Sequence, residues 1–181
     1  MIIIALTGKK GSGKGTVADY IKIRHGAVVF RFSKILDDIL IRLHLPHTRD
    51  NQIQLALDLR QLYGNDILAK VLAKDIQSTR PDIAVVDGVR YQDEWNIIKT
   101  LPNAKLIAMS ANADKRYQRI TMRNEKADDT GLSQEQFNEQ EARKTELQID
   151  SLLKIADHSI INDGTLDELN KKIEHVLSLC F

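Results

Sequence analysis

Residues 2–16 read IIIALTGKKGSGKGT and contain the pattern that decides the fold. The apolar run 2–6, rich in β-branched residues, is typical of a strand that is covered on both faces in a parallel sheet. Similar runs follow at 27–30, 83–86, 106–109 and, more weakly, 159–161. Because segments with helical spacing separate these runs, the sequence predicts an α/β doubly wound sheet of five parallel strands.

Several signals mark the helices. Segment 48–78 is predicted to form one or two helices, which end before Pro81. Capping boxes at 133–136 (SQEQ) and 165–168 (TLDE) each open a further helix. The last helix carries one predicted apolar stripe, made of Leu166, Leu169, Ile173, Val176 and Leu177. Since no repeat or linker-like stretch divides the chain, we expect one domain over residues 1–181.

The glycine-rich segment 8–14 fulfils the spacing G-x-x-x-x-G-K between a strand and a helical pattern. In that context backbone N–H groups face inward and bind an anion, and the helix N-terminus adds positive potential. We expect the loop to hold the phosphates of ATP or a similar triphosphate, with Lys14 reaching the β- and γ-phosphates. The predicted nucleotide-binding residues are Gly8, Gly11, Ser12, Gly13, Lys14, Gly15 and Thr16.

Two residues are candidates for binding Mg²⁺. Gly15 stands where many such loops place a metal-binding Ser or Thr, and Thr16 follows one residue later. Asp87 belongs to an Asp-Gly-Val-Arg element after the third strand, and ligands of open parallel sheets lie at the carboxyl ends of strands. We therefore expect Thr16 and Asp87 to organise Mg²⁺, and Arg90 to hold a phosphate with its planar fork. The alternative is that Asp87 forms a simple turn and Arg90 is a solvated surface residue.

Arginines recur at helical spacing later in the chain. Arg116, Arg119 and Arg123 lie three and four residues apart, near one face of a helix. The polar segment 124–131 that follows is suited to the tip of a lid, whose cations stabilise the charge of a transferred phosphoryl group. Arg143 could face the same phosphates. The alternative is a solvated helix.

Two further residues are singled out in apolar surroundings. Arg60, within Leu-Arg-Gln-Leu-Tyr-Gly, is a candidate for a substrate phosphate; the alternative is a surface residue with its head in water. Trp95 is the only tryptophan, and we expect it to anchor packing rather than to stack on a base.

The composition is that of an ordinary globular protein, with 43% hydrophobic and 28% charged residues. The formal net charge of +1 lacks the basic excess of a nucleic-acid-binding surface, so no nucleic-acid partner is expected. The first apolar run meets glycine and lysine too early to span a bilayer and lacks a basic leader, so we expect no membrane association and a cytoplasmic location. The single cysteine, Cys180, excludes an intrachain disulfide. Nothing in the sequence predicts the oligomeric state.

Together these segments resemble the P-loop small-molecule kinases: nucleoside and deoxynucleoside monophosphate kinases, adenylate-kinase-related proteins and dephospho-coenzyme A kinases. Segment 8–16 looks like the phosphate loop of adenylate kinases, and segment 87–90 is similar to their Asp-Gly-Phe-Pro-Arg, one residue shorter. Segment 116–123 resembles the start of their lid. Segment 156–165 looks like the stretch before the last helix of dephospho-coenzyme A kinases and adenylate-kinase-related proteins.

The resemblance covers nearly the whole chain. It implies the P-loop kinase type of sheet, with helical acceptor-binding insertions (about 33–79) and a short lid (about 116–143). It also implies ATP and Mg²⁺ as cofactors, with Arg116, Asn162 and Gly164 beside the nucleotide; the loop that contains Asn162 and Gly164 would border the adenine. The predicted catalytic residues are Lys14, Asp87, Arg119 and Arg123, and the predicted acceptor-binding residues are Arg60, Arg90 and Arg143.

The acceptor is inferred from one position at which this sequence departs from the pattern of dephospho-coenzyme A kinases. Dephospho-coenzyme A kinases carry an aspartate just after the second strand, suited to deprotonating a ribose hydroxyl. Segment 30–34 (FRFSK) has none, and Asp37 and Asp38 follow about one turn later. A phosphate acceptor needs mainly cations, so the sequence favours a nucleoside or deoxynucleoside monophosphate. The alternatives are dephospho-coenzyme A kinase chemistry and a P-loop NTPase that acts as a binding switch.

Overall fold

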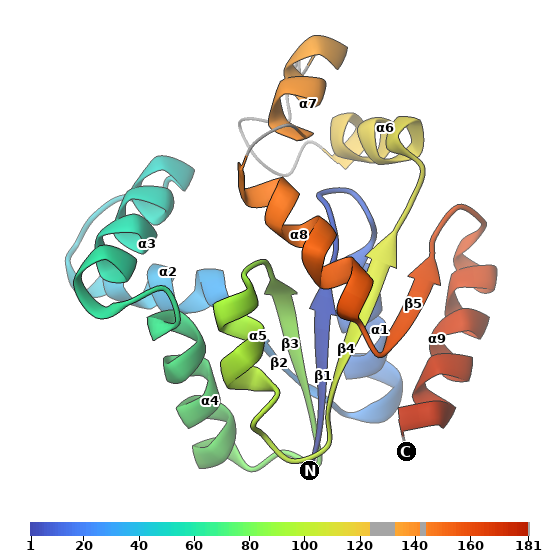
Figure 1. The fold of residues 1–181 in the computed structure, drawn as a ribbon, viewed down its shortest axis with the longest axis horizontal. Coiled ribbons are helices and arrows are strands. Elements are labelled where there is room, and N and C mark those ends of the chain that lie inside the picture. Colours follow the sequence, from blue (N-terminus) through green and yellow to red (C-terminus); the bar gives the residue numbers. More distant parts are fainter. Residues whose placement is uncertain (124–132, 142–143, 181) are drawn as a thin grey trace.

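The computed structural model describes residues 1–123, 133–141 and 144–180 (Figure 1). Strands and helices alternate along the chain, with two extra helices after the second strand and two after α6. The elements are β1 (Ile2–Thr7), α1 (Lys14–His25), β2 (Val28–Arg31), α2 (Phe32–Arg42), α3 (Arg49–Tyr63), α4 (Ile67–Thr79), β3 (Ile83–Val89), α5 (Gln92–Ile98), β4 (Ala104–Ser110), α6 (Ala113–Arg123), α7 (Gln134–Glu141), α8 (Lys144–Ile155), β5 (His158–Ile161) and α9 (Leu166–Cys180).

The sheet has five parallel strands in the order β2-β3-β1-β4-β5, which confirms the predicted fold class. After β1 the chain builds β2 and β3 on one side of that strand and β4 and β5 on the other. Ligands of such sheets bind outside the carboxyl ends of the strands, where the direction of winding reverses. The glycine-rich loop leaves β1 at this point.

Helices cover both faces of the sheet, which explains why β1 is apolar at every position from 2 to 6 (Figure 1). Ile4 and Leu6 face α1 and α9, in a cluster that includes Ile21 and Ile173. The alternate positions Ile3 and Ala5 face a second cluster, which contains residues of α4, α5 and α8. Trp95 belongs to this second cluster and is 7% exposed, which confirms its predicted role in packing.

A smaller cluster joins α2, α3 and α4. Leu36, Ala56 and Leu68 form its buried centre. Figure 1 shows α3 standing apart from the sheet, so this cluster fixes the position of α3 relative to the carboxyl edge. The predicted helical segment 48–78 is therefore two helices, separated at Gly64, whose φ is 96°.

Local predictions hold at both capping boxes and fail at two places. Ser133 and Gln136 exchange side-chain-to-backbone hydrogen bonds, as do Thr165 and Glu168. Leu166 does not belong to the buried stripe of α9, because it is 60% exposed. The third strand is longer than predicted: it continues through Asp87 and Gly88 to Val89, and the pairing register shifts between Leu6 and Thr7.

Candidate active site

The loop 8–13 can form only with glycine at key positions. Gly8, Gly11 and Gly13 have φ angles of 145°, 78° and 100°. A Cβ at Gly8 would collide with the carbonyl oxygen of Met109, and a Cβ at Gly13 would collide with the side-chain amide of Asn162. The predicted glycine-rich turn is therefore required both by backbone conformation and by the close approach of β4 and the loop after β5.

Lys14 is the first residue of α1, and its side chain turns back over the loop. Its ammonium donates to the carbonyl oxygens of Gly8 at 2.6 Å and Lys9 at 3.1 Å. Ser12 is fully buried, and its hydroxyl has no hydrogen-bond partner within the described residues. An ammonium, a buried hydroxyl and the N-terminus of α1 thus lie together, as an anion site requires.

Three side chains from distant elements hold the loop in shape by binding its carbonyl groups. The carbonyl oxygens of residues 10, 11 and 12 accept from Arg116 at 3.3 Å, Arg119 at 3.4 Å and Asn162 at 3.0 Å, respectively. Arg119 also donates to the carbonyl oxygen of Asn162 at 2.8 Å. The structure therefore brings three of the predicted nucleotide-site residues directly onto the loop.

A cluster of carboxylates that was not predicted from the sequence contacts the same loop. Arg116 is 5% exposed and donates to both carboxylate oxygens of Glu141, at 2.8 and 2.7 Å. Lys9 lies 3.6 Å from Glu141 and 3.2 Å from Asp150. The guanidinium of Arg116 also lies over the ring of Phe137, at 5.4 Å from its centroid. These contacts tie α6, α7 and α8 to the loop.

A cavity of 550 Å³, here called the P-loop cavity, borders the loop. It brings together six of the predicted residues, which come from the loop, α1, α6 and the loop after β5: Gly11, Gly13, Thr16, Arg119, Asn162 and Gly164. Met122, Leu166 and Leu169 supply an apolar wall. Leu166 is therefore exposed because it lines this cavity rather than the buried stripe of α9.

Part of the predicted lid lies outside the described residues. This applies to the polar segment 124–131, to Arg143 and to the side chain of Arg123. Their proposed roles stay predictions.

Asp87 lies on β3 opposite Leu6 of β1, next to the start of the loop. Its carboxylate accepts from Arg31, the last residue of β2, at 3.2 Å, and Arg31 also donates to Asp19 of α1 at 3.2 Å. The side chain of Asp87 is 14% exposed, so it is not the solvated turn residue of the alternative interpretation. Arg31 was not singled out from the sequence.

The residues present fit a Mg²⁺ ion that is shared with phosphates. Mg²⁺ is usually held by one or two carboxylates and completes its octahedron with water and phosphate oxygens. Among the described residues, no three Asp, Glu, His or Cys side chains gather into an all-protein metal site. The single carboxylate of Asp87, which Arg31 holds beside the loop, matches binding of Mg²⁺ by one carboxylate together with phosphate and water oxygens. Thr16 lines the P-loop cavity, and its part in metal binding stays a prediction.

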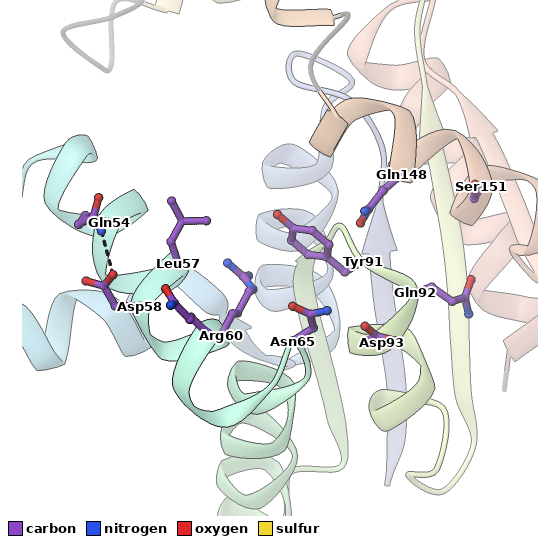
Figure 2. Close-up of a pocket in the computed structure, with 11 residues that line it drawn as sticks. Gln54, Leu57, Asp58, Arg60, Asn65, Tyr91, Gln92, Asp93, Gln148 and Ser151 are labelled. Carbon is purple, nitrogen blue, oxygen red and sulfur yellow. Dashed lines mark hydrogen bonds between the residues drawn. The ribbon is translucent and has the colours of Figure 1, made fainter.

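A second cavity, here called the α3 cavity, has a volume of 790 Å³ and lies between α3, the start of α5 and α8 (Figure 2). Arg60 lines it, with its guanidinium over the ring of Tyr91 at 4.6 Å from the centroid. The side chain of Arg60 is 15% exposed, so the interpretation as a surface residue with its head in water is wrong. Arg90 follows β3 directly; it is exposed and is not among the residues that line this cavity.

Glu94 binds several groups beside this cavity. It was not predicted from the sequence, where it looks like an acidic residue on a helix surface. It is 1% exposed and accepts from Arg60 at 3.0 Å and from the backbone N–H groups of Arg90 at 2.9 Å and Tyr91 at 3.2 Å. Burial raises the pKa of the Glu94 carboxyl above its ordinary value, and the hydrogen bonds from Arg90 and Arg60 only partly oppose that rise. One buried carboxyl group therefore fixes the guanidinium of Arg60 and the backbone of Arg90 and Tyr91.

Comparison with known proteins places the chain in a family. A UPF0200 protein of Sulfurisphaera tokodaii is 30% identical over 177 residues, which cover 97% of this chain and 95% of the relative. This chain belongs to the UPF0200 family. No model of a known protein family matches the sequence. None of the helices in the described ranges is long and apolar enough to cross a bilayer.

Solved structures confirm the resemblance to P-loop small-molecule kinases at the level of the fold. Shikimate kinase from Bacteroides thetaiotaomicron superimposes with a TM-score of 0.65 and 11% identity, covering 98% of this chain and 97% of that enzyme. Shikimate kinase from Acinetobacter baumannii, solved with shikimate, gives a TM-score of 0.54 and 17% identity, covering 99% of this chain and 94% of its own. The UPF0200 chain thus has the fold of P-loop kinases.

Proposed function

We propose that this UPF0200 protein is a kinase that transfers a phosphoryl group from ATP to a nucleoside or deoxynucleoside monophosphate, with Mg²⁺. The observation that carries the proposal is the pair of cavities at the carboxyl edge of the sheet. The P-loop cavity borders the phosphate loop, and the α3 cavity lies beyond the end of β3 and contains Arg60. A kinase needs two such places, because donor and acceptor must be bound together.

The residues around the glycine-rich loop would bind the donor, ATP. The loop amides and Lys14 would bind the phosphates, for which the ammonium has only to leave the carbonyl oxygens of Gly8 and Lys9. Asp87 would hold Mg²⁺, and the metal would neutralise charge on the phosphate oxygens. Arg119 at the loop would oppose the negative charge that spreads over the transferred group. The base would occupy the P-loop cavity, beside Asn162 and Gly164.

The acceptor side supplies cations rather than a base. Glu94 holds the guanidinium of Arg60 and the backbone of Arg90, and both arginines would bind the acceptor phosphate. Neither candidate base is poised for proton transfer: Asp37 accepts from Gln52 at 2.5 Å, and Asp38 is paired with Lys34 at 2.5 Å. Segment 30–34, at the end of β2, contains no aspartate. These contacts favour a phosphate acceptor over the ribose hydroxyl of dephospho-coenzyme A.

We also propose that residues 1–181 act as one domain, in which the helices of about 33–79 form the acceptor side and about 116–143 forms the lid. The packing of α3 against α2 and α4 supports the first assignment, and the contacts of Arg116 and Arg119 with the loop support the second.

An acceptor screen tests the proposal. The protein is incubated with ATP, Mg²⁺ and each monophosphate or dephospho-coenzyme A, and ADP release and the phosphorylated product are both measured. Turnover of a monophosphate is expected. Product from dephospho-coenzyme A alone would replace the acceptor assignment, and acceptor-independent ATP hydrolysis that responds to a macromolecule would replace the kinase by a binding switch.

A further inference from the structure

The lining of the α3 cavity is unusually rich in side-chain amides. Five of the eleven residues that line it are Gln or Asn: Gln54, Gln61, Asn65, Gln92 and Gln148. They come from α3, the loop after it, α5 and α8; the amide of Gln54 donates to Asp58 at 2.8 Å and that of Gln92 donates to Asn96 at 3.2 Å (Figure 2). Each amide both donates and accepts hydrogen bonds, and this combination matches the polar edge of a heterocyclic base.

The charges in the cavity restrict the ligand further. Arg60 is the one cation among the lining residues, and it is already partly neutralised by Glu94 at 3.0 Å. Two exposed residues with carboxylates, Asp58 and Asp93, also line the cavity, and one oxygen of Asp58 accepts a hydrogen bond from Gln54 at 2.8 Å (Figure 2). A ligand that carries one phosphate can place it at Arg60. An additional carboxylate or phosphate on the same ligand would be repelled by Asp58 and Asp93.

Arg60 and Tyr91 add a flat surface. The guanidinium lies over the tyrosine ring at 4.6 Å from its centroid, and Figure 2 shows both side chains at the gap between α3 and the start of α5. Stacked arginine and aromatic planes are surfaces on which bases pack. The Nε of Arg60 is buried without a hydrogen-bond partner in the described part of the chain, so the pair keeps unused hydrogen-bonding capacity.

From these observations, and building on the proposed function, we infer that the α3 cavity binds the base of the acceptor nucleotide and selects bases that carry an exocyclic amino group. The amino group donates to the carboxylate of Asp58 or Asp93, in the way that acidic side chains accept from the amino group of cytosine. A base with an oxo group at that position places an acceptor against a carboxylate and is rejected. Cytosine and adenine nucleotides are therefore preferred over uracil and hypoxanthine nucleotides.

The preference is measured by equilibrium binding, without ATP, on two matched pairs of probes. CMP is compared with UMP, and AMP with IMP, by calorimetry at one ionic strength. Within each pair the phosphate and sugar are the same, so the ratio of dissociation constants reports the amino group alone. Because a hydrogen bond to a charged group is strong, we expect the amino-bearing member of at least one pair to bind about tenfold more tightly. Equal binding within both pairs overturns the inference.

Conservative variants test which groups carry the preference. In the double variant Asp58→Asn/Asp93→Asn the side chains keep their size and lose their charge, so the ratio is expected to fall to within about twofold. Asp75→Asn, an exposed position on α4 outside the cavity, is the control and should keep the wild-type ratio. Thermal melts establish that each variant is folded. A double variant that is folded and keeps the full ratio overturns the assignment to these carboxylates.

The test also separates this inference from the kinase assignment. Selective binding of CMP or AMP without any phosphoryl transfer supports the base site and refutes the proposed reaction. Phosphorylation of UMP or IMP with the same kcat/KM as their amino-bearing partners supports the reaction and overturns the base site.

Discussion

Glu94→Gln is the substitution for which the structure makes the least obvious prediction. Glu94 holds Arg60 and the N–H groups of Arg90 and Tyr91, yet burial raises its pKa despite these donors. The buried carboxylate is therefore less stable, relative to its protonated form, than the same group in the unfolded chain. Glu94→Gln relieves this penalty but leaves the guanidinium of Arg60, which is 15% exposed, without its carboxylate partner, so the free energy of unfolding at pH 7 is expected to fall by about 1–3 kcal/mol.

The pH dependence follows from the sign of this shift. An acid whose folded-state pKa is raised contributes stability below its unfolded pKa, near the ordinary value of 4.5, and loses that contribution as the pH rises through the raised value. The stability of the variant relative to wild type should therefore increase as the pH rises through this window. Urea unfolding across a pH series measures it, with the exposed Glu139→Gln as a control that shows no such trend.

The affinity of the variant for the acceptor should fall. The charge-assisted bond between Arg60 and Glu94 is worth about 1.5–3 kcal/mol, and its loss frees Arg60 to leave the acceptor site. We expect the KM of the acceptor to rise about tenfold or more and the KM of ATP to change much less. A variant that keeps the full wild-type stability at pH 7, or one that keeps the wild-type acceptor KM, would refute this account of Glu94.

Three further substitutions probe the phosphate, metal and acceptor assignments. Lys14→Ala should abolish phosphoryl transfer and leave the circular dichroism melt close to that of wild type; normal turnover would exclude the loop as the donor site. Asp87→Asn should lower the rate and shift the Mg²⁺ titration of turnover to higher concentrations, and an unchanged titration at an unchanged rate would make Asp87 a structural partner of Arg31. Arg90→Ala should raise the KM of the acceptor about tenfold or more through loss of a charged hydrogen bond, with little change in the ATP constant, and steady-state kinetics that show the reverse pattern would move Arg90 to the donor side.

The parts of the structure that could be predicted from the sequence are those in which neighbouring residues carry the signal. The apolar run 2–6 indicated a strand covered on both faces, and the spacing of glycines and Lys14 indicated the phosphate loop. The capping boxes at 133–136 and 165–168 were also local, since each depends on residues three apart. The strand and both capping boxes are confirmed, while phosphate binding by the loop stays a prediction.

The residues of the candidate site that could not be predicted from the sequence contact partners that are distant in the chain. Arg31 meets Asp87 across 56 residues, and Glu94 meets Arg60 across 34. A buried acid on a short helix looks like a solvated one until the fold is known. Leu166 was misassigned for a related reason: its spacing fits the buried stripe of α9, but its position at the start of that helix places it at the P-loop cavity.

The hydrogen bonds that Arg116, Arg119 and Asn162 make to the carbonyl groups of residues 10–12 have a consequence for how quickly and at what entropic cost a ligand binds. They hold these three carbonyl groups by contacts that need no phosphate, so the loop is ordered before any ligand arrives. An ordered receptor loses little conformational entropy on binding, and association need not wait for a rearrangement of the backbone. Nucleotide association should accordingly be fast, and the variant Asn162→Ala, which removes the contact to the carbonyl group of Ser12, should slow it.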